Sequence, residues 1–323
     1  MKKTGIVYGP VPSRRLGISL GIDLTPFFHC TMDCIYCEIN VRKNRTLVVP
    51  HDKLPSKYDV LSKLSERLRE ISPRTLDFVT FSGSGEPTLH PDLRDIAIGA
   101  KKIMSEFKIP SKLALITNST LLYRREIKTF ANLFDVILGK LDAATEEVLK
   151  KINNPIPQIN LEAIVDGLRE TAKGGNLWIT TMFVKGYNDS PEEIKRLTRL
   201  INEISPSIYL VDSPCRPPGN KIALSQDELL KIANSMEQEL SVELRIVSRT
   251  PLYREIPQIT HSRLVEEILS VLAIRPSTID DLSRTLGEDE KVIRTILDML
   301  VENFTIEKKD DFYRVRRQAT LHQ

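Results

Sequence analysis

Apolar residues along the chain follow two spacings, which together predict an alternation of strands and helices. Between residues 56 and 71 they recur every three or four positions, as in Val60, Leu64 and Leu68, which indicates an amphipathic helix. Short apolar or alternating runs instead indicate strands. We expect strands at 18–24, 76–82, 113–117, 135–138, 177–184 and 207–212, and further helices near 92–106, 121–133 and 225–240. Six strands separated by helical segments predict parallel βαβ units, with ligands at the carboxyl ends of the strands.

The last part of the chain has a different pattern. Three helices are expected at 261–273, 278–286 and 289–302, followed by two short strands at 304–307 and 312–315. That order resembles a winged helix, a domain whose third helix normally enters the major groove of DNA. We therefore expect two domains, at 1–250 and 259–323.

The charge of this second domain makes duplex DNA an unlikely partner. Residues 288–303 carry five acidic side chains and two basic ones, a net charge of −3, so DNA phosphates repel this helix. A role in protein docking or as a lid is at least as well supported as nucleic-acid binding. Arg314, Arg316 and Arg317 leave a weaker RNA alternative open.

The composition is that of an ordinary globular protein. Hydrophobic residues make up 41% and charged residues 28% of 323 residues, enough chain for one large core and a small second one. No apolar run approaches the roughly 20 residues that span a bilayer, and the first residues lack the apolar segment of a signal peptide. The net charge of +3 is too small to indicate a polyanionic partner. We expect a cytoplasmic protein with no membrane partner.

Three of the four cysteines, Cys30, Cys34 and Cys37, lie within eight residues, and this crowding indicates a metal site. A structural zinc site has four closed ligands, usually as two separated pairs, and would need His29 or a distant residue as the fourth. A [4Fe-4S] cluster with three cysteines fits the spacing better, and it leaves one iron open to a small molecule. Grouped, reduced thiols also agree with a reducing compartment.

The Cys-x3-Cys-x2-Cys spacing, with Tyr36 before the last cysteine, resembles the signature of the radical S-adenosylmethionine (SAM) superfamily. Together with GPVPSRRLGISLGIDL at 9–24, it is similar to a group of that superfamily related to the wyosine-forming tRNA enzymes. The resemblance implies a partial (β/α)6 TIM-like barrel, one [4Fe-4S] cluster on the three cysteines, and SAM on the open iron. An electron from the reduced cluster would then cleave SAM and release a 5′-deoxyadenosyl radical, which abstracts a hydrogen atom from the substrate.

The resemblance also implies which residues hold SAM. A loop after the second strand consists of Gly83, Ser84, Gly85, Glu86 and Pro87. It matches the Gly-Gly-Glu-Pro-like loop of the superfamily, with Ser84 at the second glycine, and is expected to hold the methionine amino group. Asn118 and Asp142, with Lys140 behind them, follow later strands and are expected to contact the ribose or carboxylate of SAM, with Tyr36 near the adenine. Capping of the following helix is the alternative for these polar strand-end residues.

The substrate stays open: an RNA base, a peptide or protein, or a small metabolite. Arg14 and Arg15 are candidates for holding an anionic substrate group, with surface ion pairs as an equal alternative. Cys215, on a proline-rich loop, is an unspecialised thiol in the interpretation we favour, and otherwise a hydrogen donor, a covalent anchor or a ligand. The electron would come from a donor such as flavodoxin or ferredoxin. The competing hypothesis is a winged-helix regulator with an iron-sulfur sensing domain, against which the acidic third helix argues.

Overall fold

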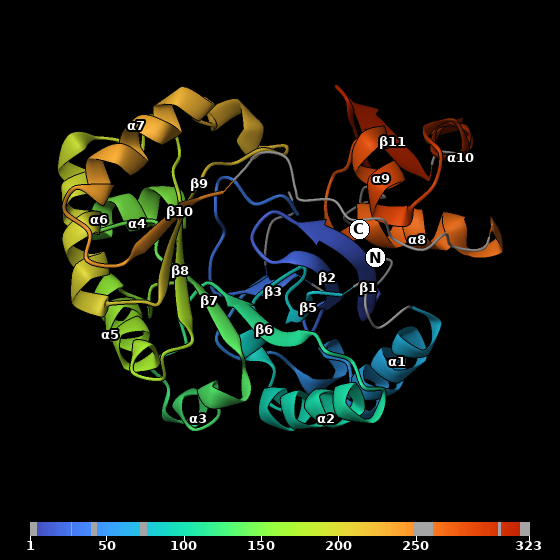
Figure 1. Cartoon of the computed structure of the whole chain (residues 1–323), viewed down its shortest axis with the longest axis horizontal. Coiled ribbons are helices and arrows are strands. Elements are labelled where there is room, and N and C mark those ends of the chain that lie inside the picture. Colours follow the sequence, from blue (N-terminus) through green and yellow to red (C-terminus); the bar gives the residue numbers. More distant parts are fainter. Residues whose placement is uncertain are drawn as a thin grey trace, which may run out of the picture.

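The computed structural model describes residues 5–26, 28–39, 44–71, 76–247, 261–302 and 305–316, with only the backbone at 261–263. Its main feature is a curved sheet with helices on its outer face (Figure 1). In spatial order, the strands are β1 (Val7–Ser13), β2 (Gly17–Ile22), β5 (Phe78–Phe81), β6 (Lys112–Thr117), β7 (Val136–Lys140), β8 (Leu177–Met182), β9 (Ile208–Asp212) and β10 (Glu243–Ile246). All neighbouring pairs of these strands are parallel except β1 and β2. The mixed α/β class with a partial TIM-like barrel is therefore confirmed.

The outer helices begin where the sequence offers caps. They are α1 (Lys57–Glu70), α2 (Leu93–Glu106), α3 (Arg125–Lys128), α4 (Glu146–Ile152), α5 (Leu161–Ala172), α6 (Pro191–Ile204) and α7 (Gln226–Glu237). The Ser56 hydroxyl accepts a hydrogen bond from the N–H of Asp59 at the start of α1, and Ser225 forms a capping box with Glu228 at the start of α7. Each cap satisfies backbone donors that a helix start leaves unpaired, which fixes the first turn.

Successive residues of each strand alternate between the helices and the inside of the barrel. On β6, Leu113 and Leu115 belong to the large core beneath the helices, whereas Ala114 belongs to a separate inner cluster. Leu16, in the turn between β1 and β2, packs into this inner cluster against Ala114 and Val136. The turn of the first hairpin thus fills part of the barrel interior, and it carries Arg14 and Arg15 with it.

Residues 9–13 belong to β1, because Gly9 at φ +91° and a bulge between Tyr8 and Val11 let a proline-rich strand pair with β2, and residues 14–16 form the turn between the two strands. One local prediction was wrong. The helix expected near 121–133 is reduced to α3 and a 3-10 turn at Ala131–Leu133. The amide oxygen of Asn118 accepts hydrogen bonds from the N–H and hydroxyl of Thr120, and this local turn replaces the first helical turn.

The C-terminal elements follow the predicted order. They are α8 (His261–Ile274), α9 (Ile279–Leu286), α10 (Glu290–Glu302) and an antiparallel hairpin of β11 (Ile306–Lys309) and β12 (Phe312–Val315). Their assignment as a winged helix stays a prediction. The division at 250–259 also stays a prediction, because residues 248–260 lie outside the described part of the chain.

These elements share a core with the first strand of the sheet, which Figure 1 shows beside α8 and α9. Tyr8 and Val11 of β1 are buried in one cluster with Leu264, Ile268 and Leu282. An ion pair of 2.6 Å between Arg67 and Glu267 also joins α1 to α8. The C-terminal segment therefore covers an edge strand that would otherwise expose apolar side chains.

Among the described helices, none combines the length and the apolar character that crossing a membrane requires.

Candidate functional site

The cysteine triplet lies in a loop that is held by hydrogen bonds to distant parts of the chain. Two short strands, β3 (His29–Cys30) and β4 (Asn44–Arg45), pair in parallel across the base of this loop. The N–H of Asp33 donates to the carbonyl of Asn153 at 2.9 Å. The N–H of Ile35 donates to the carbonyl of Ile152, also at 2.9 Å. The end of α4 therefore fixes where the thiols stand.

The thiols fit an iron-sulfur cluster by their chemistry. Burial, strengthened by Asp142, raises the pKa of Cys34 to about 12, and burial likewise raises the pKa of Cys30. Side-chain N–H groups point at both sulfurs, from Asn118 to Cys30 Sγ at 3.4 Å and from Asn153 to Cys34 Sγ at 3.3 Å. A bound metal removes the thiol proton outright, and N–H donors to the sulfurs tune such clusters. Cys37 stands in the same loop, its N–H bonded to the carbonyl of Cys34 at 3.1 Å.

A single zinc ion fits the side chains less well. Within the described ranges, no three His, Cys, Asp or Glu side chains are grouped as ligands of one metal ion. His29, the candidate fourth zinc ligand, lines a pocket with Arg45 and Gln158. A cluster does not require convergence on one point, since each cysteine binds a different iron.

The loop from Gly83 to Pro87 lies directly against the start of the cysteine loop. A Cβ atom on Gly85 would stand 1.9 Å from the carbonyl oxygen of His29, so only glycine fits there. Ser84 points away from the thiols, and its hydroxyl donates to Asp23 Oδ2 at 2.5 Å and to the carbonyl of Thr25 at 2.9 Å. The serine that departs from the superfamily pattern therefore anchors the loop to the end of β2.

Gly85→Ala is expected to lower the free energy of unfolding by about 1–3 kcal/mol, because the added methyl group overlaps main chain that cannot turn aside. Denaturant titration measures the loss. Gly174→Ala is the matched control, since its Cβ would meet nothing closer than the Asn176 side chain at 3.1 Å. Equal stability of the two variants would contradict the close approach of the loops.

Glu86 is buried and its carboxylate accepts four hydrogen bonds from protein donors. Oε1 accepts from the N–H and hydroxyl of Thr88 at 3.1 and 2.6 Å and from the hydroxyl of Thr117 at 2.7 Å. Oε2 accepts from the N–H of Asn118 at 2.7 Å. The hydrogen bonds from Thr117 and Asn118 tie this loop to the end of β6.

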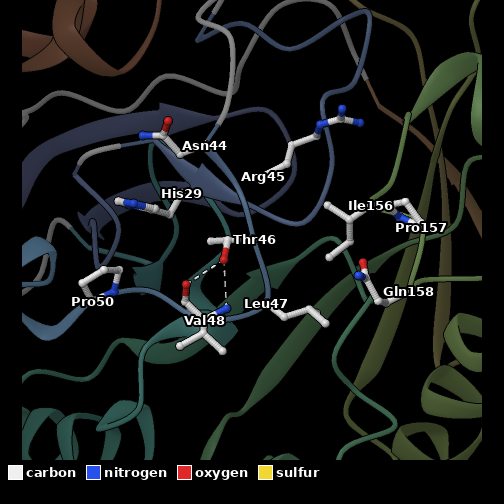
Figure 2. A pocket seen from close by; sticks show the side chains of 10 residues that line it. All are labelled: His29, Asn44, Arg45, Thr46, Leu47, Val48, Pro50, Ile156, Pro157 and Gln158. Carbon is white, nitrogen blue, oxygen red and sulfur yellow. Dashed lines mark hydrogen bonds between the residues drawn. The ribbon is translucent and has the colours of Figure 1, made fainter.

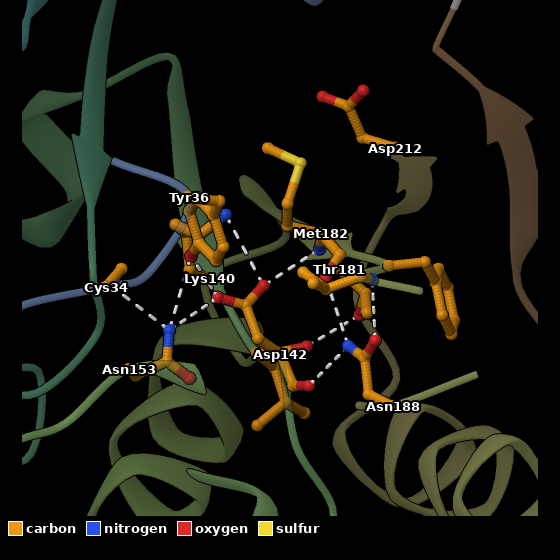
Figure 3. A network of polar contacts seen from close by, with 12 residues as sticks. Cys34, Tyr36, Lys140, Asp142, Asn153, Thr181, Met182, Asn188 and Asp212 are labelled. Atoms are coloured by element: carbon orange, nitrogen blue, oxygen red, sulfur yellow. Dashed lines mark hydrogen bonds and ion pairs between the residues drawn. The ribbon is translucent and has the colours of Figure 1, made fainter. Parts of the chain in front are cut away.

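A second network joins the cysteine loop to the ends of β7 and β8 (Figure 3). Tyr36 donates its hydroxyl to Asp142 Oδ2, which also accepts from Asn153 Nδ2 at 2.8 Å. The other carboxylate oxygen accepts from the N–H of Met182 at 2.8 Å. Lys140 lies 5.0 Å from the centre of the Tyr36 ring and 3.4 Å from Asp142. Burial and the charge of Asp142 raise the pKa of Tyr36 well above its usual value, so Tyr36 stays a hydrogen-bond donor.

The structure thus brings the predicted residues into two groups around the cysteine loop, one at Glu86 and Asn118 and one at Tyr36, Lys140 and Asp142. Asn153, which contacts Cys34 from 119 residues away, was not among the residues predicted from the sequence. No local sequence pattern marks Asn153 as a site residue, because asparagine is common at helix ends.

A cavity of about 750 Å³ opens on another side of the cysteine loop (Figure 2). Its lining is His29, Asn44, Arg45, Thr46, Leu47, Val48, Pro50, Ile156, Pro157 and Gln158. Arg45 is held by the carbonyl and the side-chain oxygen of Asn154 at 3.1 and 3.0 Å. The volume suits a small molecule or one residue of a larger substrate.

Arg14 and Arg15 form ion pairs, but not on the surface. Both contact Asp212 at the end of β9, with Arg14 Nη1 2.8 Å from Oδ1. Cys215 follows three residues later and lies 3.6 Å from the guanidinium of Arg216. The two arginines therefore lie at the end of β9, which is close in sequence to the loop that carries Cys215.

Comparisons with known proteins agree with this fold. The protein named GTPase Obg of Brachyspira hyodysenteriae is 32% identical over 307 residues, which are 93% of this chain and 43% of that protein. A UPF0026 protein of Synechocystis sp. is 33% identical over 218 residues, 65% of this chain and 76% of that protein. The Dual-specificity RNA methyltransferase RlmN 2 of Myxococcus xanthus is 25% identical over 209 residues, 64% of this chain and 53% of that protein. The chain thus spans less than half of the first of these relatives.

A solved structure, of a radical SAM methyltransferase from Sphaerobacter thermophilus, superposes with a TM-score of 0.51 at 13% identity. The match covers 71% of this chain and 65% of that one and shows a shared fold. Residues 24–199, more than half of the chain and including the cysteine triplet, match the model of the radical SAM superfamily. The chain therefore belongs to the radical SAM superfamily, whose enzymes use SAM and an iron-sulfur cluster.

Proposed function

We propose that the protein uses one [4Fe-4S] cluster to cleave SAM reductively and to abstract a hydrogen atom from a substrate. The observation that carries this proposal is the cysteine loop itself. Its buried thiols receive N–H groups from Asn118 and Asn153, and the Gly83–Pro87 loop lies against its first residue. Superfamily membership supplies the cofactor pair, and the donor set fits it.

The residues of the site have separable roles in this proposal. Cys30, Cys34 and Cys37 hold the cluster, which leaves one iron for the amino and carboxylate groups of SAM. When bound, the cluster and SAM supply the electron and the radical, and the protein holds them in place. The Gly83–Pro87 loop would hold the methionine amino group with its backbone and with Glu86, whose Oε2 accepts a single hydrogen bond from the described part of the chain.

The second network would serve the nucleoside part of SAM. Tyr36 is fixed by Asp142 and Asn153, so its ring cannot turn away from the loop. Asn118 has one amide hydrogen toward Cys30 and donates to the Thr31 hydroxyl at 2.8 Å. In this role Asn118, Lys140 and Asp142 would contact the ribose or carboxylate, as expected from the strand ends.

Substrate, electron donor and location belong to the proposal as well. An RNA substrate is supported by the relative named an RNA methyltransferase. A peptide, a protein or a small metabolite stays a candidate substrate. A flavodoxin or ferredoxin would deliver the electron. All four cysteines are free, which agrees with the reducing cytoplasm.

A winged-helix regulator with a sensing cluster is the second candidate. The exposed face of α10 carries Asp298 and Glu302 beside Arg294, which disfavours binding to duplex DNA. Tight sequence-specific DNA binding by the full chain would promote this candidate over an enzyme.

Protein reconstituted without oxygen tests the proposal. We expect a brown protein with four irons and four sulfides per chain, visible absorption that dithionite bleaches, and an electron paramagnetic resonance signal of the reduced cluster that changes when SAM is added. Stoichiometric zinc without iron would contradict the cluster, and a signal unaffected by SAM would contradict the open iron.

Glu86→Gln is expected to lower the free energy of unfolding by about 1–3 kcal/mol, since the amide nitrogen would face donors where an oxygen now accepts. We also expect weaker SAM binding with the iron content unchanged, because the loop moves while the cysteines stay. Equilibrium binding of SAM to the reconstituted variant measures this. Glu106→Gln, an exposed residue of α2, is the control, and equal effects of the two changes would contradict the role of Glu86.

A further inference from the structure

A cluster of charged side chains lies where the barrel interior meets the C-terminal segment. Its members are Arg14, Arg15, Glu38, Asp212, Arg216, Arg275 and Asp281. We call it the arginine cluster. These residues come from the first hairpin, the cysteine loop, the end of β9, the loop after β9, the connection between α8 and α9, and α9 itself.

The carboxylates of the arginine cluster are engaged by three of its arginines. Asp212 forms ion pairs with both Arg14 and Arg15. Arg216 lies 3.8 Å from Glu38 and 3.5 Å from Asp281. Among the residues that the structure describes, four guanidinium groups face three carboxylates, an excess of one positive charge.

The excess charge belongs to Arg275. Its Nη1 reaches the carbonyl of Pro12 at 3.4 Å, and its Nε and Nη2 are buried without a hydrogen-bond partner among the described residues. No described carboxylate lies within ion-pair distance of it. Burial and the nearby charge of Arg216 lower the pKa of Arg275 to about 10. Burying a guanidinium whose N–H donors have no acceptor is unfavourable unless a bound group supplies the acceptors.

The position of the arginine cluster connects it to the cofactor site. Glu38 follows the third cysteine, and Lys140, which lies over Tyr36, also lowers the pKa of Asp212 together with the arginines and against burial. Arg216, which contacts both Glu38 and Asp281, links this end of the arginine cluster to the residue after the third cysteine.

We propose that Arg275, with Arg216 beside it, binds an oxyanion of the substrate, either a carboxylate or a phosphate. A planar guanidinium presents paired N–H donors that match the two oxygens of such a group, and one negative charge neutralises the excess. The inference rests on the proposed function, because it names the substrate class of that site. It also gives the C-terminal segment a part in substrate binding.

Isothermal titration of the reconstituted protein with inorganic phosphate and, separately, with sodium acetate tests this site, with sodium chloride as the ionic-strength control. We expect one of the two oxyanions to bind, and the identity of that anion distinguishes a phosphorylated substrate from a carboxylic acid. Arg275→Met should weaken the binding by about 10- to 100-fold, the loss expected for a charged hydrogen-bonded pair. Arg196→Met, an exposed residue of α6, should bind as the parent does.

Stability separates a binding role of Arg275 from a structural one. Because the charge is buried without a carboxylate, Arg275→Met should unfold no earlier than the parent in buffer without oxyanions. Arg275→Lys keeps the charge without the paired donors and should bind with intermediate affinity, which gives a second variant should methionine disturb folding.

The site is refuted if neither anion binds more tightly than chloride, or if Arg275→Met and Arg275→Lys bind as the parent does. Iron content and SAM cleavage are measured on the same samples. Normal values beside absent anion binding would refute the oxyanion site alone, whereas loss of cluster and cleavage in the parent would refute the proposed function.

Discussion

Cys34→Ala is expected to lose nearly all cluster iron and all SAM cleavage. In the proposed cluster three cysteines are the whole ligand set, so removal of one would leave an iron without a thiolate and no spare sulfur in the loop. Asn153 would then keep its contacts with Tyr36 and Asp142, so the fold around the site should persist. Iron and sulfide assays after anaerobic reconstitution measure the loss, and circular dichroism checks that the chain is folded.

Cys215→Ala is the matched control for this change, since it removes a thiol outside the triplet. It should keep iron at the level of the parent. Retention of a full cluster by Cys34→Ala, or an equal loss in Cys215→Ala, would show that the ligands have been wrongly assigned.

Asp212→Asn is expected to lower the free energy of unfolding by about 3–5 kcal/mol, because it leaves buried arginine charges without a carboxylate. The side chain of Arg14 is only 4% exposed, so water cannot replace the lost partner. Asp95→Asn, which breaks the exposed pair with Lys57 at 3.0 Å, should cost less than about 1 kcal/mol. Denaturant titrations of the three proteins at neutral pH give the comparison.

The contribution of Asp212 to the free energy of unfolding should vanish in acid. Burial raises the pKa of this carboxyl, but Arg15 and Arg14 outweigh burial and hold it below its usual 3.8. A carboxyl with a lowered pKa in the folded state stabilises the protein above 3.8 and loses that contribution as the pH falls through the folded value. The stability gap between the parent and Asp212→Asn should therefore close below about pH 3.8. A gap that stays constant in acid would mean that the ion pair is not its source.

The sequence predicted those parts of the site that are local in the chain. Cys30, Cys34 and Cys37 stand within one loop, and the glycines at 83 and 85 mark close approaches, which the structure places at Asp23 and at His29 respectively. Strand ends at Asn118 and Asp142 were also predictable, because parallel strands present their carboxyl ends at one edge. Asp142 does not act as a helix cap, which was the alternative role. Its carboxylate instead accepts hydrogen bonds from Met182, Asn153 and Tyr36.

The rest depends on contacts between distant segments, which no local pattern encodes. Asn153 meets Cys34 only because α4 packs beside the loop. The occupied carboxylate of Glu86 depends on Thr117 and Asn118 of the neighbouring strand. Arg14 and Arg15 had two equal interpretations, and the fold turned them inward because Leu16 packs inside the barrel.

Release of 5′-deoxyadenosine is the decisive measurement of whether the cysteine loop holds a cluster that breaks SAM. Anaerobically reconstituted protein is reduced with dithionite, mixed with SAM and analysed by liquid chromatography with mass spectrometry. We predict slow formation of 5′-deoxyadenosine even without substrate, and none from Cys34→Ala. Protein that carries a reduced cluster and binds SAM but releases no 5′-deoxyadenosine would contradict the account.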